Sequence, residues 1–109
     1  MNKQTLIALA ALCLCVPAFA AKGNPEAGRS KAEPCKACHG EAGISVSPEF
    51  PKIAGQHSDY LSTALRQYKL GERDHATMRS IAADLSEKDM EDLAAYYSQA
   101  AGGTSVAGK

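Results

Sequence analysis

The clearest helical pattern in the chain lies between residues 58 and 70. Leu61, Leu65 and Tyr68 recur at i, i+4 and i+7, which is the spacing of one face of a helix. Gly71 follows this stretch, at a position where a glycine commonly ends a helix. We therefore expect a helix over residues 58–70 that buries one apolar face.

A second amphipathic pattern begins near residue 86. Ser86 and Asp89 have the S-x-x-D spacing of a capping box, in which each side chain accepts a hydrogen bond from the other residue's backbone N–H. The apolar positions that follow form one stripe, made of Met90, Leu93, Ala94 and Tyr97. We expect this last helix to end at Gly102 and Gly103.

A first helix is expected from Asn24 to about Glu33. Asn24 suits the N-cap, Pro25 suits the first helical position, and Glu26 suits the positively polarised first turn. Pro34 should interrupt this helix, because proline cannot donate the backbone hydrogen bond that a helix interior needs.

The segments between these helices are more weakly patterned. Residues 40–55 are rich in Gly, Ser and Pro and predict a loop. Residues 71–77 predict a polar connection, followed by a short helix at residues 79–84. Strand signals are weak throughout, so the expected fold class is all-α, with three to five helices.

The N-terminus has the three parts of a secretory signal peptide. Lys3 supplies the positive start, residues 6–16 form the apolar core, and residues 18–20 give an A-x-A cleavage site after Pro17. The alternative is an uncleaved membrane anchor. A spanning helix usually needs ~20 apolar residues, and this stretch is shorter, so we expect residues 1–20 to be cleaved.

Cleavage would leave residues 21–109 as one domain, with an ordered core at about residues 24–101. Cys13 and Cys15 would leave with the signal segment, so that Cys35 and Cys38 are the cysteines that remain. The mature chain would be near charge neutrality, since the full chain carries 12 basic and 12 acidic residues. No basic patch or stripe indicates nucleic-acid binding.

Cys35 and Cys38 belong to the sequence CKACH, which has the C-x-x-C-H form of a c-type haem attachment site. Two thiols at this spacing can form thioethers with one edge of a porphyrin, and His39 is then held where its imidazole can bind the iron. A covalent haem would also supply apolar core to a short chain that contains no tryptophan. We therefore expect one covalent haem c and a poorly ordered apoprotein.

A redox dithiol, a zinc site and a disulfide suit this cysteine pair less well. A thioredoxin-type dithiol belongs near a βαβ pattern, which is absent from the sequence. A zinc site needs about four ligands, and His57 and His75 do not have the spacing of a zinc-binding pair. A local disulfide would give no role to the adjacent His39.

The second axial ligand of the iron is less directly indicated. Met90 lies on an apolar helical stripe, which favours a place in the core, and His57 should stand at the start of a helix. His75 and Met78 both fall in the expected connection between helices, and no apolar stripe accounts for Met78. Met78 is therefore favoured over His75, which stays open as an alternative.

Four stretches together resemble a class I c-type cytochrome, in the bacterial group whose domains also form the halves of dihaem periplasmic cytochromes. They are CKACHG, FPKIAGQHSDYL, the polar run that ends in Met78, and LSEKDMEDLAAYYS. The resemblance implies a class I cytochrome c fold wrapped around one covalent haem. It also implies that Cys35 and Cys38 form the thioethers and that His39 and Met78 are the axial ligands.

The same resemblance implies roles for two residues of the expected loop. Pro51 would belong to the segment whose backbone carbonyl accepts the second ring N–H of His39, and Ile53 would line the haem pocket. Pro34, directly before the motif, departs from the usual pattern and makes the end of the first helix uncertain. The second domain of the dihaem relatives is missing, which favours a monohaem carrier.

The expected function is that of a periplasmic electron carrier and not of an enzyme. It would be a monomer that meets redox protein donors and acceptors transiently, without stable membrane insertion after signal cleavage. An alternative is a haem-bearing subunit of a larger membrane oxidoreductase complex. An open-site haem enzyme or gas-binding protein is less favoured, because haem proteins of the c-prime kind carry the attachment motif near the C-terminus.

Overall fold

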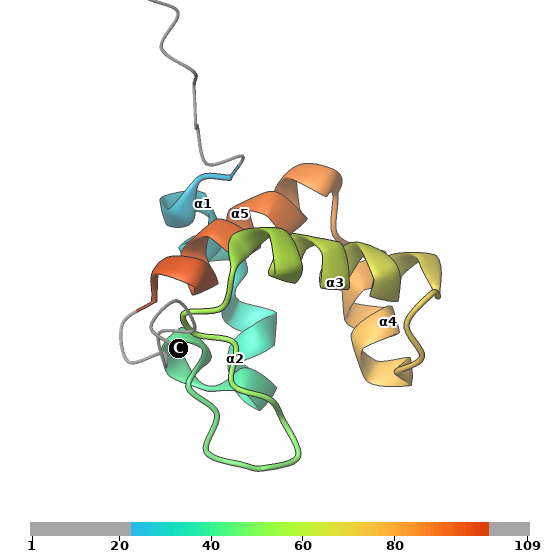
Figure 1. Cartoon of the computed structure of the whole chain (residues 1–109), viewed down its shortest axis with the longest axis horizontal. Helices are drawn as coiled ribbons and strands as arrows, with labels where there is room; N and C mark the ends of the chain where they lie inside the picture. Colours follow the sequence, from blue (N-terminus) through green and yellow to red (C-terminus); the bar gives the residue numbers. More distant parts are fainter. Residues whose placement is uncertain (1–22, 101–109) are drawn as a thin grey trace, which may run out of the picture.

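The computed structural model describes residues 23–100, in which five α-helices and one short 3-10 helix form (Figure 1). In chain order they are α1 Pro25–Lys31, α2 Glu33–His39, η1 Glu41–Gly43, α3 Ser58–Leu70, α4 Ala76–Ala83 and α5 Glu87–Gln99. These residues contain no strand, so the all-α expectation is confirmed. The predicted signal peptide and the predicted helix end at Gly102 and Gly103 lie outside the described residues.

The two best-patterned helices form as the sequence predicts. Helix α3 has the expected bounds, and Gly71 ends it in the left-handed conformation at φ 76°. Helix α5 opens with the expected capping box, since Ser86 and Asp89 each accept a hydrogen bond from the other's backbone N–H. The stripe of α5 is buried in full, at Met90, Leu93, Ala94 and Tyr97.

Three other boundaries differ from the prediction. Helix α1 ends at Lys31, and α2 then runs through the cysteine motif, where no helix was predicted. Pro34 causes no break because it lies in the first turn of α2, where a backbone N–H has no helical partner. The residues predicted as loop, 40–55, include the short helix η1. The predicted helix at residues 79–84 exists as α4, but it begins three residues earlier, at Ala76.

Helices α1 and α5 pack against each other (Figure 1), and Gly28 of α1 lies close to Asp92 of α5 where they cross. A Cβ atom added at Gly28 would overlap the backbone carbonyl of Asp92 and would lie 2.8 Å from the Cβ of Tyr96. The absence of a side chain at this position therefore lets the two backbones approach closely.

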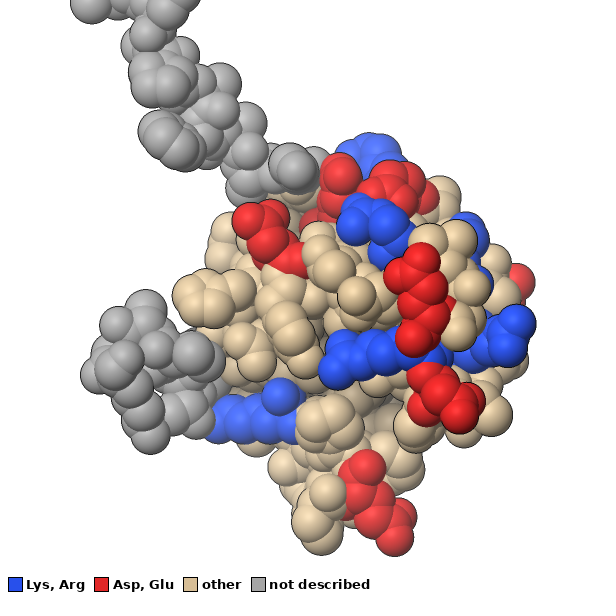
Figure 2. Space-filling model, turned by 45° about the vertical axis from the view of Figure 1, so that its right-hand side comes forward, with Lys and Arg blue, Asp and Glu red and all other residues tan. Residues whose placement is uncertain are grey.

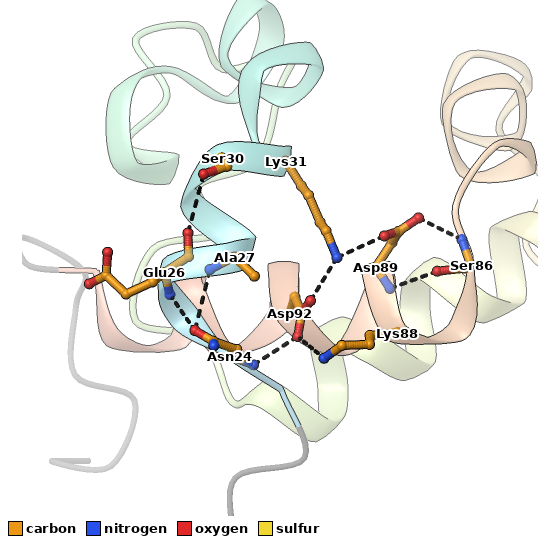
Figure 3. A network of polar contacts seen from close by, with 9 residues as sticks. All are labelled: Asn24, Glu26, Ala27, Ser30, Lys31, Ser86, Lys88, Asp89 and Asp92. Carbon is orange, nitrogen blue, oxygen red and sulfur yellow. Dashed lines mark hydrogen bonds and ion pairs between the residues drawn. The ribbon is translucent and has the colours of Figure 1, made fainter.

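The same crossing carries a polar network around one buried carboxylate, Asp92 (Figure 3). Asp92 is fully buried and accepts hydrogen bonds from the backbone N–H of Asn24 at 2.8 Å and from Lys31 Nζ at 2.7 Å. Lys88 Nζ is a third donor at 3.2 Å, and Lys31 also pairs with Asp89 at 2.8 Å. These contacts fasten both ends of α1, at Asn24 and Lys31, to the first half of α5.

The segment between η1 and α3 forms a long loop, seen below α3 in Figure 1. The returning part of this loop is held by backbone hydrogen bonds from the N–H groups of Ile53 and Ala54 to the carbonyl of Gly43, at 3.0 and 3.2 Å. The N–H of Gly55 donates to the carbonyl of Tyr97 on α5 at 2.8 Å. The loop is thus tied to the C-terminal helix at a fixed position.

The central core is small. Its buried cluster consists of Ala32, Leu61, Leu93, Ala94 and Tyr97. In the described part of the chain, no helix is both long and apolar enough to cross a membrane.

Candidate functional site

A cavity of about 400 Å³ opens beside this core. Its walls come from α2, the loop before α3, and helices α3, α4 and α5. Figure 1 shows how these elements are arranged, with α3 above, and α2 and α4 on opposite sides below it. A volume of this size falls within the range of ~300–1,000 Å³ that is usual for cofactor and ligand pockets.

Every site residue predicted from the sequence lines this one cavity: Cys35, Cys38, His39, Pro51, Ile53 and Met78. They are separated by as many as 43 positions along the chain, from Cys35 to Met78. The fold therefore brings together the residues that the motif and the resemblance had indicated.

His39 is held in one orientation by the loop. Its Nδ1 lies 2.8 Å from the carbonyl oxygen of Pro51, and the residue is 9% exposed. Since a carbonyl oxygen can only accept, Nδ1 carries the proton and donates it, and Nε2 keeps its lone pair. The expected hydrogen bond to Pro51 is thus present, and it leaves Nε2 as the basic ring nitrogen.

The location of Met78 corrects one expectation. Met78 was expected in a loop, but it lies in the first turn of α4 and is half-buried. The helix starts early because His75 acts as its N-cap, with Nδ1 accepting a hydrogen bond from the backbone N–H of Met78 at 3.2 Å. Met78 and Ile81, three residues apart on α4, both line the cavity.

Of the other three candidate ligands of the iron, one lines the cavity and two do not. Met90 is 2% exposed and belongs to the buried stripe of α5, and His57 is an exposed residue at the N-cap of α3. Neither lines the cavity. His75 does line it, so Met78 and His75 both stand at the α4 side of the site.

The two cysteines are free thiols on α2 and are half-buried. Burial raises the pKa of the Cys35 thiol above its usual value, so this sulfur is held in its neutral form. The hydroxyl of Tyr97 lies next to this thiol, and burial raises the pKa of the hydroxyl too. Neutral sulfur in an apolar wall suits a thioether better than a metal thiolate.

A zinc site is not supported. The described residues contain no group of three or more His, Cys, Asp or Glu side chains that could hold a metal ion. A protein-only cage therefore does not form around the cysteine pair.

The sequence did not indicate that Arg73 meets Tyr60 and Tyr68 in the cavity wall. Arg73, in the connection after α3, lies with its guanidinium carbon 5.8 Å from the ring centre of Tyr60 and 5.2 Å from that of Tyr68. The available signal was the spacing of the two tyrosines, since positions i and i+8 of a helix share a face. Arg73 itself gave no signal within a run of polar residues.

The donor set fits a covalently bound haem. Two thiols and an imidazole with a free Nε2 lie on α2, and a thioether sulfur lies on α4, around one largely apolar cavity. These features define a c-type haem protein with an all-helical fold.

Comparison with known proteins identifies the family of this chain. The family model of cytochrome c matches residues 26–101, and the chain belongs to this family. Family membership implies a covalently attached haem c, with which the Cys35 and Cys38 pair is consistent. Cytochrome c proteins transfer electrons to and from redox partners, so the expectation of an electron-transfer protein and not an enzyme agrees with this membership.

Curated relatives include cytochrome c4 of Pseudomonas aeruginosa, 42% identical over 89% of this chain and 48% of the relative. Cytochrome c-554(548) of Halomonas halodenitrificans is 39% identical over 70% of this chain and 95% of the relative. A thiosulfate dehydrogenase electron acceptor of Thiomonas intermedia is 37% identical over 84% of this chain and 40% of the relative.

The fold also matches a solved structure. The crystal structure of reduced recombinant cytochrome c4 from Pseudomonas stutzeri superposes with a TM-score of 0.67 at 41% identity, over 70% of this chain and 45% of that one. The expected class I cytochrome fold is thereby confirmed. The chain spans about half the length of the cytochrome c4 relatives, whereas the match to cytochrome c-554(548) covers nearly all of that protein.

Proposed function

We propose that the chain is a periplasmic electron carrier with one covalent haem c. Cys35 and Cys38 would form the thioethers, and His39 and Met78 would be the axial ligands, with Ile53 in the pocket wall. The observation that carries this proposal is the convergence of these side chains on one cavity, with the His39 ring fixed by Pro51.

The haem, when bound, supplies an iron that alternates between the ferrous and ferric states. The chain's own residues set the conditions for that exchange. Pro51 orients the His39 ring and increases the basicity of Nε2, because the Nδ1 proton is shared with a carbonyl oxygen. The Met78 sulfur would be a soft, neutral ligand that favours ferrous iron. With both ligands bound, the site would have no open position for oxygen or peroxide.

A single haem is supported by the sequence, which contains one C-x-x-C-H motif, and by the near-complete match to cytochrome c-554(548). The apolar segment and A-x-A site at residues 1–20 support export to the periplasm and cleavage. We infer a monomer that meets its redox partners transiently. On the face drawn in Figure 2, acidic and basic side chains are interspersed, an arrangement that suits brief encounters with several partners.

A second candidate is a haem-bearing subunit of a larger membrane oxidoreductase complex. It is favoured by the loop before α3, where Val46 is fully exposed and Ile44 is 40% exposed. Apolar side chains on a loop that also lines the cavity would suit a permanent interface. Recovery of the protein in the soluble periplasmic fraction, free of membrane proteins, would support the carrier. Co-purification with a membrane oxidase or dehydrogenase would support the subunit.

The ligation is tested with two matched variants, Met78→Leu and Met90→Leu, each of which removes a sulfur and keeps the side-chain volume. Ferric wild-type protein should show the weak red charge-transfer band of a methionine sulfur bound to iron. The band should vanish in Met78→Leu, with a lower reduction potential, and should persist in Met90→Leu. If His75→Asn changes the spectrum and Met78→Leu does not, the axial assignment is wrong. Rapid carbon monoxide binding by ferrous wild-type protein would contradict a closed site.

A further inference from the structure

The hydroxyl of Tyr97 is a polar group inside an otherwise apolar part of the core. Tyr97 is 3% exposed and belongs to the buried cluster, and it also lines the cavity. The side chain that contacts its hydroxyl is the Cys35 thiol on α2, and the described residues offer no second hydrogen-bond partner. Since a buried hydroxyl is costly unless it is hydrogen-bonded, this one depends on the sulfur of Cys35.

The ring of Tyr97 is held on several sides. It packs edge-on against the ring of Tyr96, with 4.9 Å between the ring centres. A Cβ atom added at Gly43 would lie 2.8 Å from its Cδ1, so the ring also touches the backbone there. The Tyr97 carbonyl accepts a hydrogen bond from the N–H of Gly55 at 2.8 Å. Because a closely packed ring cannot turn without moving its neighbours, the hydroxyl stays beside Cys35.

Attachment of haem changes what the Cys35 sulfur can do. In thioether formation the S–H group adds across a vinyl group, so that sulfur bonds to one carbon and the hydrogen goes to the other. The resulting sulfur has lone pairs but no proton, and it can only accept a hydrogen bond. The Tyr97 hydroxyl must then be the donor. Burial raises the pKa of this hydroxyl, which keeps the proton on its oxygen.

We propose that Tyr97 is a positioning residue of the haem site, whose hydroxyl donates a hydrogen bond to the thioether sulfur of Cys35 and thereby raises the reduction potential. This inference rests on the proposed covalent haem. The positive end of the O–H dipole points at a sulfur that is bonded to the porphyrin edge. It favours the electron-rich ferrous state over the ferric state, and the apolar surroundings screen it little.

Proton NMR of the ferrous holoprotein observes the hydrogen bond directly. The Tyr97 hydroxyl proton should exchange slowly with water and show nuclear Overhauser effects to the Cys35 β-protons. It should be absent in Tyr97→Phe and present in Tyr96→Phe. Should the ferrous protein be paramagnetic because Met78 is not bound, carbon monoxide makes it diamagnetic and the same measurement is made.

The reduction potential tests the consequence. In Tyr97→Phe the equilibrium constant for reduction should fall by about two- to tenfold, the factor that corresponds to the net contribution of one ordinary hydrogen bond. Tyr96→Phe is the matched control, because Tyr96 is the neighbouring tyrosine on α5 and does not line the cavity, and its potential should equal that of wild type. The red charge-transfer band should remain in both variants, which shows that Met78 is still bound.

A double-mutant cycle separates the hydrogen bond from general packing. Cys35→Ala can still attach haem through Cys38, and in this background Tyr97→Phe should no longer lower the potential. A purely structural effect of Tyr97 would lower it in both backgrounds.

The proposal is overturned if the Tyr97 hydroxyl proton contacts a buried water in place of Cys35, or exchanges at the rate of an exposed hydroxyl. An unchanged potential in Tyr97→Phe also overturns it. Should Tyr97→Phe fail to fold, the NMR contacts of the wild-type protein give the decision. Failure of the underlying haem assignment looks different, because the denatured wild-type protein then carries no covalently bound haem.

Discussion

Asp92 is the clearest case in which one side chain has a structural role separate from the haem site. Its carboxylate is fully buried, and the hydrogen bond from the Asn24 backbone N–H, together with Lys31, lowers its pKa to about 2. Asp89, which shares Lys31, also has its pKa lowered to about 2, first by Lys31 and then by the backbone N–H of Ser86. Burial without partners would have had the opposite effect on both groups.

These lowered pKa values make a prediction about acid stability. A carboxyl whose pKa is lower in the folded state stabilises that state above its unfolded pKa, and this contribution is lost as the pH falls toward the folded value. We predict that Asp92→Asn is less stable than wild type at pH 7. The difference in free energy of unfolding between the two proteins should shrink between about pH 5 and pH 2.

Urea unfolding of the holoproteins, followed by circular dichroism at several pH values, measures this difference. Asp84→Asn is the control, because Asp84 is exposed at the end of α4 and lies outside the network. The difference in free energy of unfolding between wild type and Asp92→Asn could instead stay constant down to about pH 2. That result would show that the buried carboxylate does not contribute pH-dependent stability.

At the residue scale, sequence indicated Cys35, Cys38 and His39 because their spacing is itself the signal. Met78 was indicated by elimination and by the resemblance. The structure places it in the cavity wall, but in the helix α4 and not in the loop that the sequence predicted. The cap that starts α4 early is the His75 side chain, and histidine is an uncommon N-cap that propensity does not predict. Arg73 could not be found, because its environment is created by two tyrosines that meet it only in three dimensions.

At the scale of elements, the long helices were predicted with their starts correct, whereas α1 and α4 were predicted with shifted bounds and α2 was not predicted. Helices α3 and α5 each span 13 residues and carry both periodicity and caps. Helices α2 and α4 span 7 and 8 residues, lengths at which an isolated helix is not stable in water. These two helices are stabilised by packing around the cavity. The residues within each helix therefore give little indication that a helix forms there.

The crossing of α1 and α5 gives a prediction at this scale. In Gly28→Ala the new Cβ would overlap the Asp92 carbonyl, which is backbone and cannot rotate away. Alanine favours a helix over glycine by ~1 kcal/mol, but the two helices must move apart to accept it. We expect a net loss of about 1–3 kcal/mol in the free energy of unfolding, as is usual for overpacking.

Chemical denaturation of the holoprotein measures this loss. Ser30→Ala is the control, because Ser30 is on the exposed side of the same helix and its replacement should change stability little. Equal stability of Gly28→Ala and wild type would mean that the helices do not approach as closely as the crossing indicates.

At the scale of the whole molecule, the cavity dominates the balance between folded and unfolded states. The buried core cluster contains five residues, two of them alanine, whereas the adjoining cavity is about 400 Å³. Without a cofactor, the apolar side chains that line this space would be exposed to water, so the polypeptide alone gains little of the burial that stabilises a domain of this size.

We therefore predict that the double variant Cys35→Ala/Cys38→Ala, which cannot attach haem, lacks fixed tertiary structure. The short helices that line the cavity, α2 and α4, should be lost first, since each is too short to persist without packing. Near-ultraviolet circular dichroism should be flat, amide NMR signals should be poorly dispersed, and thermal unfolding should be broad. The holoprotein should unfold in one sharp transition. A haem-free variant with native helix content and a cooperative transition would show that the polypeptide closes the cavity without its cofactor. The fold would then be stable without the haem, and the haem would not be a necessary part of the core.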